Sequence, residues 1–120
     1  MIRAGETLLE AANIFIGVGA CPVRLKIPGE DLVVTSDDFM ELRSLPSQIL
    51  FLGGGFISFE FANVAVRAGS TVKIVDRHEL PLKSFDPDLV RLLVKCSEAA
   101  GIDILTATEA TVGQRATPHW

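Results

Sequence analysis

The chain has 120 residues, enough for one domain with a buried core. Hydrophobic residues make up 48% of it and charged residues 22%, which excludes a disordered chain. Its 11 basic and 15 acidic residues give a net charge of −4 with no basic run, so nucleic acid is not an expected partner.

The first 47 residues are predicted to hold short extended pieces and one short helix. Residues 7–10 and 13–19 have the apolar, turn-bounded pattern of strands. Acidic and amide side chains interrupt their hydrophobicity, unlike a signal peptide or a membrane span. Further along, Ser36 is predicted to cap a helix with Asp37 and Asp38 in its first turn.

The two cysteines have neither the spacing of a redox pair nor that of a metal site. Cys96 shares a helical spacing with Leu89, Leu92 and Leu93, which predicts packing in the core. Cys21 precedes a proline in a loop and is predicted to be a surface thiol. This usage favours a reducing compartment, the cytoplasm, over a secreted disulfide fold.

From residue 49 onward, strands and helices are predicted to alternate strictly. Gly69 and Gly101 end the two helices as left-handed caps, and Asp86 caps the start of the second one. The order β-α-β-α-β predicts an α/β, Rossmann-like parallel sheet with right-handed crossovers. The predicted elements are 49–53, 56–69, 71–76, 87–100 and 102–105.

The segment GGGFIS, residues 53–58, fits a dinucleotide-binding glycine turn with serine in the third motif position. Gly53 permits the tight turn, Gly55 lets a pyrophosphate approach the backbone, and Ser58 sets the helix-to-strand distance. Free amides at the helix start then bind the phosphate charge. Two alternatives stay open from the residues alone: a tight turn that binds nothing, and a methyltransferase that binds adenosylmethionine.

The helix after the turn is apolar around its whole circumference, so the sheet can cover only part of it. Another element or partner is therefore expected against a second side. Glu60 lies among these apolar residues with no basic residue at helical spacing. We interpret it as a carboxylate that reaches a cation outside this unit.

Residues 12–114 resemble the flavin-dependent pyridine nucleotide-disulfide oxidoreductases, the family of glutathione reductase and dihydrolipoamide dehydrogenase. The N-terminal part looks like the edge of the FAD domain and its connector, and the next part like the start of the NAD(P)H domain. The segments that carry the resemblance are NIFIGVGACP, IPGEDLVVTSDDFMELRSLP, ILFLGGGFISFEFANVAVRAGSTVKIVDR and LKSFDPDL.

By position, the resemblance implies a dinucleotide site along the glycine turn and the helix that follows it. Phe56 stands where many members have a tyrosine lid over the flavin, and Glu60 matches a glutamate near nicotinamide that pairs with a lysine of the FAD domain. Gly19 lies in the segment that touches FAD, although the family's Ala-Thr-Gly reads Gly-Val-Gly here. The implied turn and helix residues are Gly53, Gly55, Phe56, Ile57, Ser58 and Glu60.

The end of the second strand of this unit carries two opposed cofactor signals. Asp76 stands at the position of an acid that normally hydrogen-bonds the adenosine ribose of NAD(H) and would repel the 2′-phosphate of NADP(H). Arg77, His78 and Lys83 align with the bases that clamp this phosphate in the glutathione reductase branch. Three aligned bases favour NADP(H) over NAD(H), with tolerance of both.

The resemblance implies the NAD(P)H-binding module of a flavoprotein disulfide oxidoreductase, which passes hydride to FAD. The flavin fingerprint, the CxxxxC disulfide and the interface domain have no counterpart, so FAD and its domain are expected from a companion segment or chain, and full-length members are homodimers. The alternative is a truncated, noncatalytic nucleotide-binding or partner-binding remnant. The expected parts are 1–47, FAD-domain edge and connector; 48–113, NAD(P)H half-domain; and 114–120, a tail.

Overall fold

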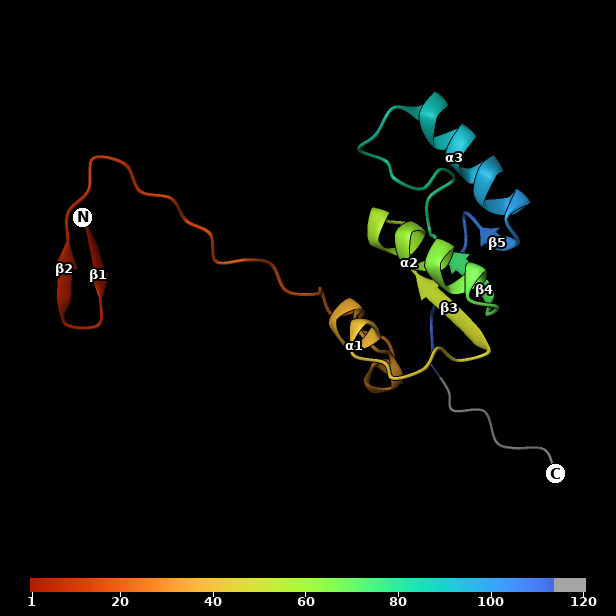
Figure 1. The fold of residues 1–120 in the computed structure, drawn as a ribbon, viewed down its shortest axis with the longest axis horizontal. Helices are drawn as coiled ribbons and strands as arrows, with labels where there is room; N and C mark the ends of the chain where they lie inside the picture. The colour runs from red at the N-terminus through yellow and green to blue at the C-terminus, as the bar shows by residue number, and fades with distance from the viewer. Residues whose placement is uncertain (114–120) are drawn as a thin grey trace.

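The computed structural model describes residues 1–113, and the predicted tail at 114–120 lies outside the described residues. The chain forms a two-stranded hairpin, a connector with two short helices and an α/β unit (Figure 1). Within residues 1–113, no helix combines the length and the apolar character needed to cross a membrane. The elements are β1 (Ile2–Ala4), β2 (Thr7–Leu9), η1 (Glu30–Leu32), α1 (Ser36–Met40), β3 (Gln48–Leu52), α2 (Phe56–Arg67), β4 (Thr71–Val75), α3 (Pro87–Ala99) and β5 (Ile102–Leu105).

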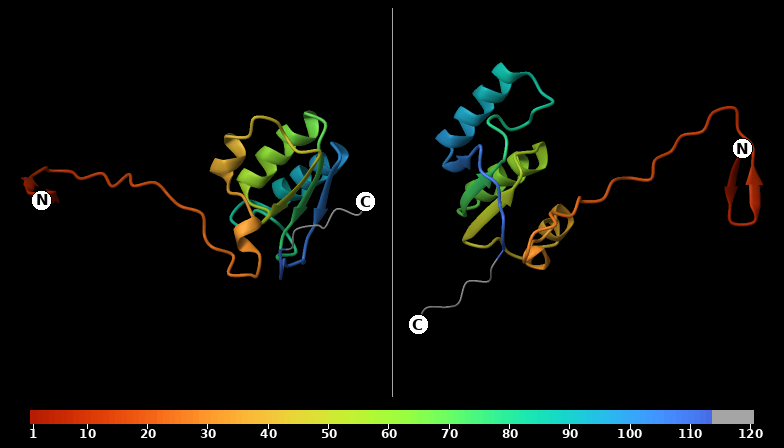
Figure 2. Two further views of the ribbon diagram at one scale, coloured as in Figure 1. Left: turned by 90° about the horizontal axis from the view of Figure 1, so that it is seen from below. Right: turned by 180° about the vertical axis from the view of Figure 1, so that it is seen from behind.

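The α/β unit is a three-stranded parallel sheet in the order β3-β4-β5, which confirms the predicted β-α-β-α-β arrangement. Both α2 and α3 pack on one face of this sheet (Figure 2). Apolar side chains from α2, β4 and β5 fill the space between helix and sheet, and Ile49 and Phe51 of β3 are partly buried against them. The fully buried members of this core are Phe59, Ala62, Ala65, Val72, Ile74 and Ile102.

The opposite face of the sheet is largely exposed within the described residues. Lys73 and Asp103 lie side by side on β4 and β5 and form an ion pair of 2.7 Å there. Leu50, which pairs with Lys73 in the strand register, is 56% exposed on β3. The alternation of the strands therefore assigns one face to the helices and leaves a mixed apolar and charged face open.

The predicted core position of Cys96 is wrong, because this side chain is exposed on α3. Val90 and Ser97 are the α3 residues that are buried, and Val94 packs against the core between them. Leu89 shares the exposed face with the cysteine. The row of residues that begins at Val90 and the row that begins at Leu89 both have helical spacing. The row that begins at Val90 is the one that packs on the sheet at β5.

The start of α1 also differs from the prediction, since its N-cap is Thr35 and not Ser36. The Thr35 side chain accepts from the Asp38 amide, and the Asp38 carboxylate accepts from the Thr35 amide, which is a capping box. The cap orients Phe39 toward α2, where its ring stacks on Phe61 with centroids 4.5 Å apart. A connector helix of this chain thus covers a second side of α2.

The N-terminal arm, residues 1–25, projects away from the α/β unit (Figure 1). β1 and β2 pair antiparallel within it, whereas the predicted strand at 13–19 is wrong, because this segment pairs with no other strand of the described residues. Phe15 in that segment is 94% exposed. A strand needs a neighbouring strand to pair its backbone N–H and C=O groups, and residues 1–113 place no strand beside this segment.

The connector meets the segment that follows β5 at one close contact. The Gly113 amide donates to the Pro28 carbonyl at 2.7 Å. Gly29 has a φ of 80°, and a Cβ on it would collide with the Gly113 carbonyl. The connector and the segment after β5 therefore lie against each other, and the contact requires glycine at position 29.

We expect Phe39→Ala to lower the free energy of unfolding by about 2 kcal/mol, less than a fully buried phenylalanine because the ring is partly exposed. Met40→Ala is the matched control, since this neighbouring side chain is 72% exposed, and should change stability by under about 0.5 kcal/mol. Urea unfolding followed by circular dichroism measures both. Equal effects of the two variants would contradict the packing of α1 on α2.

Candidate functional site

The glycine turn joins β3 to α2 in a conformation that only glycine adopts readily. Gly53 has a φ of 97°, and its amide donates to the Val75 carbonyl of the neighbouring strand at 2.8 Å. Gly55 is the N-cap of α2 in an extended conformation, with φ −83° and no side-chain cap. The turn is thereby tied to the end of β4 before the helix begins.

The first turn of α2 presents a set of unpaired backbone donors. Within residues 1–113, the amides at positions 55, 56, 57 and 58 donate to no backbone or side-chain acceptor. A Cβ built on Gly55 meets no atom within 4 Å, so the space beside these amides is open. Unpaired amides and the positive end of the helix dipole together favour an anion at this place.

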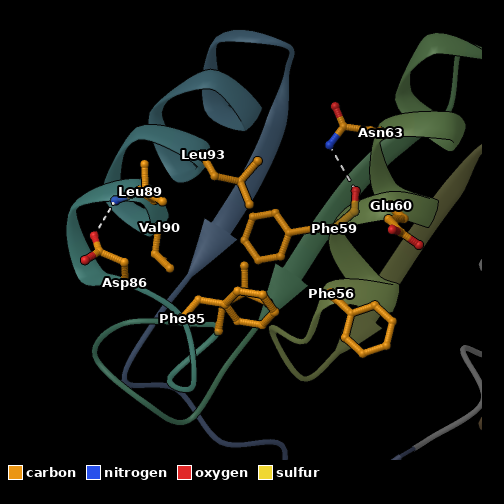
Figure 3. Close-up of a pocket in the computed structure, with 10 residues that line it drawn as sticks. Phe56, Phe59, Glu60, Asn63, Phe85, Asp86, Leu89, Val90 and Leu93 are labelled. Carbon is orange, nitrogen blue, oxygen red and sulfur yellow. Dashed lines mark hydrogen bonds between the residues drawn. The ribbon is translucent and has the colours of Figure 1, made fainter.

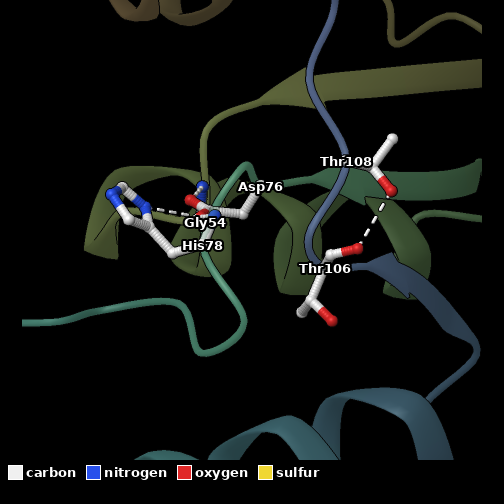
Figure 4. A network of polar contacts seen from close by, with 5 residues as sticks. All are labelled: Gly54, Asp76, His78, Thr106 and Thr108. Carbon is white, nitrogen blue, oxygen red and sulfur yellow. Dashed lines mark hydrogen bonds and ion pairs between the residues drawn. The ribbon is translucent and has the colours of Figure 1, made fainter.

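Asp76 lies directly after β4 and is 8% exposed (Figure 4). Its Oδ2 accepts from the Gly54 amide at 2.6 Å. Its Oδ1 accepts from the His78 amide at 2.7 Å and lies 2.8 Å from Nδ1 of the same residue. The acid therefore joins the glycine turn to the loop that follows β4.

The backbone of Asp76 and His78 is fixed as well. The Asp76 amide donates to the Leu105 carbonyl, and the Asp76 carbonyl accepts from the Thr108 amide, both at 2.9 Å. The His78 carbonyl accepts from the Ala107 amide at 2.9 Å. The segment after β5 thus holds the loop after β4 in place.

Opposing effects act on the pKa of Asp76. Burial raises the pKa, while hydrogen bonds from the backbone amides of His78 and Gly54 lower it, as does the His78 side chain. The lowering effects prevail, and the pKa lies below its ordinary value of 3.8. The carboxylate is ionised at neutral pH.

Gly54 is a site residue that the sequence motif did not indicate. A Cβ there would lie 2.6 Å from Cβ of Pro81 and 3.0 Å from Oδ2 of Asp76. Its carbonyl also accepts from the Leu82 amide at 3.0 Å. The motif leaves this middle position variable, and the presence of glycine there, between Gly53 and Gly55, was the available signal that the loop after β4 packs against the turn.

The basic residues predicted to bind phosphate lie on this same loop. Arg77 and Lys83 are exposed, and neither forms an ion pair with the described residues. The His78 side chain is 39% exposed beside Asp76. The structure therefore places Arg77, His78 and Lys83 on the loop that contacts the glycine turn, at the carboxyl end of the parallel strands.

Phe56 and Glu60 lie together on another side of α2, at a hollow between α2 and α3 (Figure 3). This hollow has a volume of about 400 Å³ and is lined mainly by phenylalanine and leucine side chains. Phe56 is 57% exposed. Glu60 is exposed and forms no ion pair with residues 1–113, which is compatible with a partner outside this unit.

Gly19, the predicted FAD contact, is not brought to this site. It lies in the N-terminal arm with a φ of 73°, and a Cβ on it would meet no atom within 4 Å. Ile57, in contrast, is in the first turn of α2 and is 41% exposed. The predicted residues therefore divide between the α/β unit and the arm.

Residues 2–117 match the family model of the pyridine nucleotide-disulphide oxidoreductases. The chain belongs to this family. It is 40% identical over 101 residues to trypanothione reductase of Trypanosoma congolense, a match that covers 82% of the chain and 20% of the relative. It is 34% identical over 88 residues to glutathione reductase of Nostoc sp., a match that covers 73% of the chain and 19% of the relative.

The structural comparison identifies the same kind of protein. The HOCl-induced flavoprotein disulfide reductase of Escherichia coli, solved as a Cu(II) complex, superposes with a TM-score of 0.73 at 28% identity. The superposition covers 81% of this chain and 24% of the reductase. The 120-residue chain spans about a fifth of the length of the curated relatives that it matches.

We predict that Gly54→Ala destabilises the chain by about 3 kcal/mol, because the new methyl group overlaps buried Pro81 and the Asp76 carboxylate. Gly55→Ala, one residue along, should change the free energy of unfolding by under about 1 kcal/mol because its φ is ordinary and the space is open. Urea titrations compare the two. Equal stability of both variants would contradict the close packing at Gly54.

A second prediction follows from the lowered pKa of Asp76. Because the folded-state pKa lies below 3.8, ionisation stabilises the fold fully at neutral pH, and this contribution is lost as the pH falls below 3.8. Asp76→Asn should therefore lower the free energy of unfolding by about 2 kcal/mol at pH 7. The difference from the parent chain should shrink at pH 3, measured by urea titration. A difference that does not depend on pH would count against the charged network.

Proposed function

We propose that the α/β unit binds NAD(P)H and presents nicotinamide to FAD held by another part of the same protein or by a companion chain. The observation that carries this proposal is the row of four unpaired amides at the start of α2, beside the open space at Gly55. These donors fit the pyrophosphate of a dinucleotide. FAD receives hydride and then reduces a disulfide substrate in this proposal, as the names of the relatives suggest.

Three residues of the turn and the first helical turn fit the binding of a dinucleotide, each for a different reason. Gly53 turns the chain so that α2 points its amino end at the edge where the strands end. Gly55 offers no side chain in the space that the phosphates need. Ser58 stands at the third motif position, partly buried, where it spaces α2 from the sheet.

The side of α2 with Phe56 and Glu60 is proposed to face nicotinamide and the flavin. Phe56 provides an exposed aromatic face that can stack on a ring. Glu60, without an ion-pair partner in residues 1–113, is available to a cation of the flavin-binding part. Gly19 would reach FAD from the arm, which extends freely from the unit.

We propose further that NADP(H) is preferred over NAD(H), with both accepted. Arg77, His78 and Lys83 lie on one loop, and the two long side chains are exposed and unpaired within residues 1–113. A guanidinium can hold a phosphate through two parallel hydrogen bonds, and a lysine adds a point charge. NAD(H) has no 2′-phosphate and gains nothing from these contacts.

The cysteine content favours a second candidate function, in which the chain binds the nucleotide but catalyses no reaction of its own. The chain holds two cysteines, on the N-terminal arm and on α3, and no CxxxxC pair. Disulfide reduction therefore needs groups from outside this sequence. Oxidation of NADPH by the chain together with the flavin-binding part or companion chain that supplies FAD and a redox disulfide supports the first function, and binding without oxidation in that mixture supports the second.

The cofactor preference is tested by Arg77→Ala, which should weaken NADPH binding about tenfold and NADH binding less than twofold, because only NADPH carries the phosphate. Isothermal titration calorimetry on the full chain measures both dissociation constants. Arg91→Ala is the matched control, an exposed arginine on α3 that pairs with Asp88. Gly55→Ala should weaken both cofactors equally. An equal loss of both cofactors in the Arg77 variant would refute the phosphate contact.

A further inference from the structure

The carboxylate of Asp76 has little capacity left for a ribose. A carboxylate offers about four acceptor positions on two oxygens. Three donors of the chain itself already occupy it: the amide of Gly54, the amide of His78 and the ring of His78. At 8% exposure, the residue also lies below the surface that a ligand would reach.

His78 is fixed by several contacts on one side and open on the other. Its amide and Nδ1 both meet Oδ1 of Asp76, and its carbonyl accepts from Ala107. Figure 4 shows the second ring nitrogen on the side away from Asp76. The side chain is 39% exposed, so this outward edge is accessible to a ligand.

We propose that Asp76 is a positioning residue, which holds the His78 ring with Nδ1 inward so that Nε2 faces the 2′-phosphate of NADP(H). This inference rests on the proposed function and deepens it. An acid at this strand end ordinarily binds the ribose and signals NAD(H). Here the same acid supports the base that favours NADP(H).

The chemistry of the pair is that of a carboxylate that fixes a histidine tautomer. A carboxylate at Nδ1 accepts the proton on that nitrogen, which sets the ring orientation. When the ring is protonated, Nε2–H is directed outward and can donate to a phosphate oxygen. The negative charge of Asp76 is meanwhile engaged by three donors, so its repulsion of the phosphate is reduced.

The two roles of Asp76 predict opposite results for Asp76→Asn. As a positioning residue, its replacement should weaken NADPH binding about fivefold more than NADH binding, since one charge-assisted hydrogen bond to the 2′-phosphate is lost in addition to any effect of the altered turn on both cofactors. As a ribose ligand, its replacement should strengthen NADPH binding and weaken NADH binding. Calorimetry on the full chain at pH 7 measures both constants, and the second pattern overturns the proposal.

His78→Ala tests the pair from the other side and leaves the contact between Asp76 and Gly54 intact. It should weaken NADPH binding about tenfold and spare NADH. Adding Asp76→Asn to His78→Ala should not change the ratio of the NADPH and NADH dissociation constants further, because the positioned group is already absent. An unchanged ratio of the two constants in His78→Ala overturns the proposal, even where the asparagine variant fails to fold.

A measurement without cofactor separates this inference from the proposed function. Nitrogen-15 spectra of the His78 ring at pH 9, where histidine side chains are neutral, report which nitrogen carries the proton. The parent chain should hold it on Nδ1, and Asp76→Asn should lose that preference. An unchanged tautomer ratio refutes the positioning role. If the parent chain binds neither dinucleotide, the proposed function and the phosphate contact fail together, and the spectra still decide the pairing of Asp76 with His78.

Discussion

The hydrogen bond between the Gly54 amide and the Asp76 carboxylate is the contact on which the site geometry depends. It spans 2.6 Å and joins the turn after β3 to the end of β4. The turn cannot rotate without breaking it, so the amino end of α2 keeps its direction toward the edge of the sheet. The loop after β4 then packs on the turn through Pro81, which leaves no room for a side chain at position 54.

This contact changes how an acid at the end of a parallel strand is interpreted. The usual rule assumes that the carboxylate is free to meet a ribose. In this family member the nearest donors belong to the chain, and a buried carboxylate is satisfied by them before any ligand arrives. The identity of the residue is thus a weaker guide to the cofactor than the direction in which its oxygens point.

The sequence predicted those features that local chemistry determines. The β-α-β-α-β order, the cap at Asp86 and the left-handed glycine at position 69 each depend on neighbouring residues, and all are present. The wrong core prediction for Cys96 arose where two local patterns fit the sequence equally well. Val90 and Cys96 both lie on helical stripes of α3, and only the strand beside the helix selects between them. The packing at Gly54 likewise depends on a loop more than twenty residues away (position 54 against 81), which no local pattern encodes.

The contact between Pro28 and Gly113 brings together two segments that are far apart in the sequence. The backbone ahead of the connector helices and the backbone after β5 lie side by side there, joined by one hydrogen bond. A side chain at position 29 would push the two backbones apart and would also have to adopt a left-handed conformation. A single substitution at Gly29 would therefore disturb the chain on both sides of the α/β unit at once.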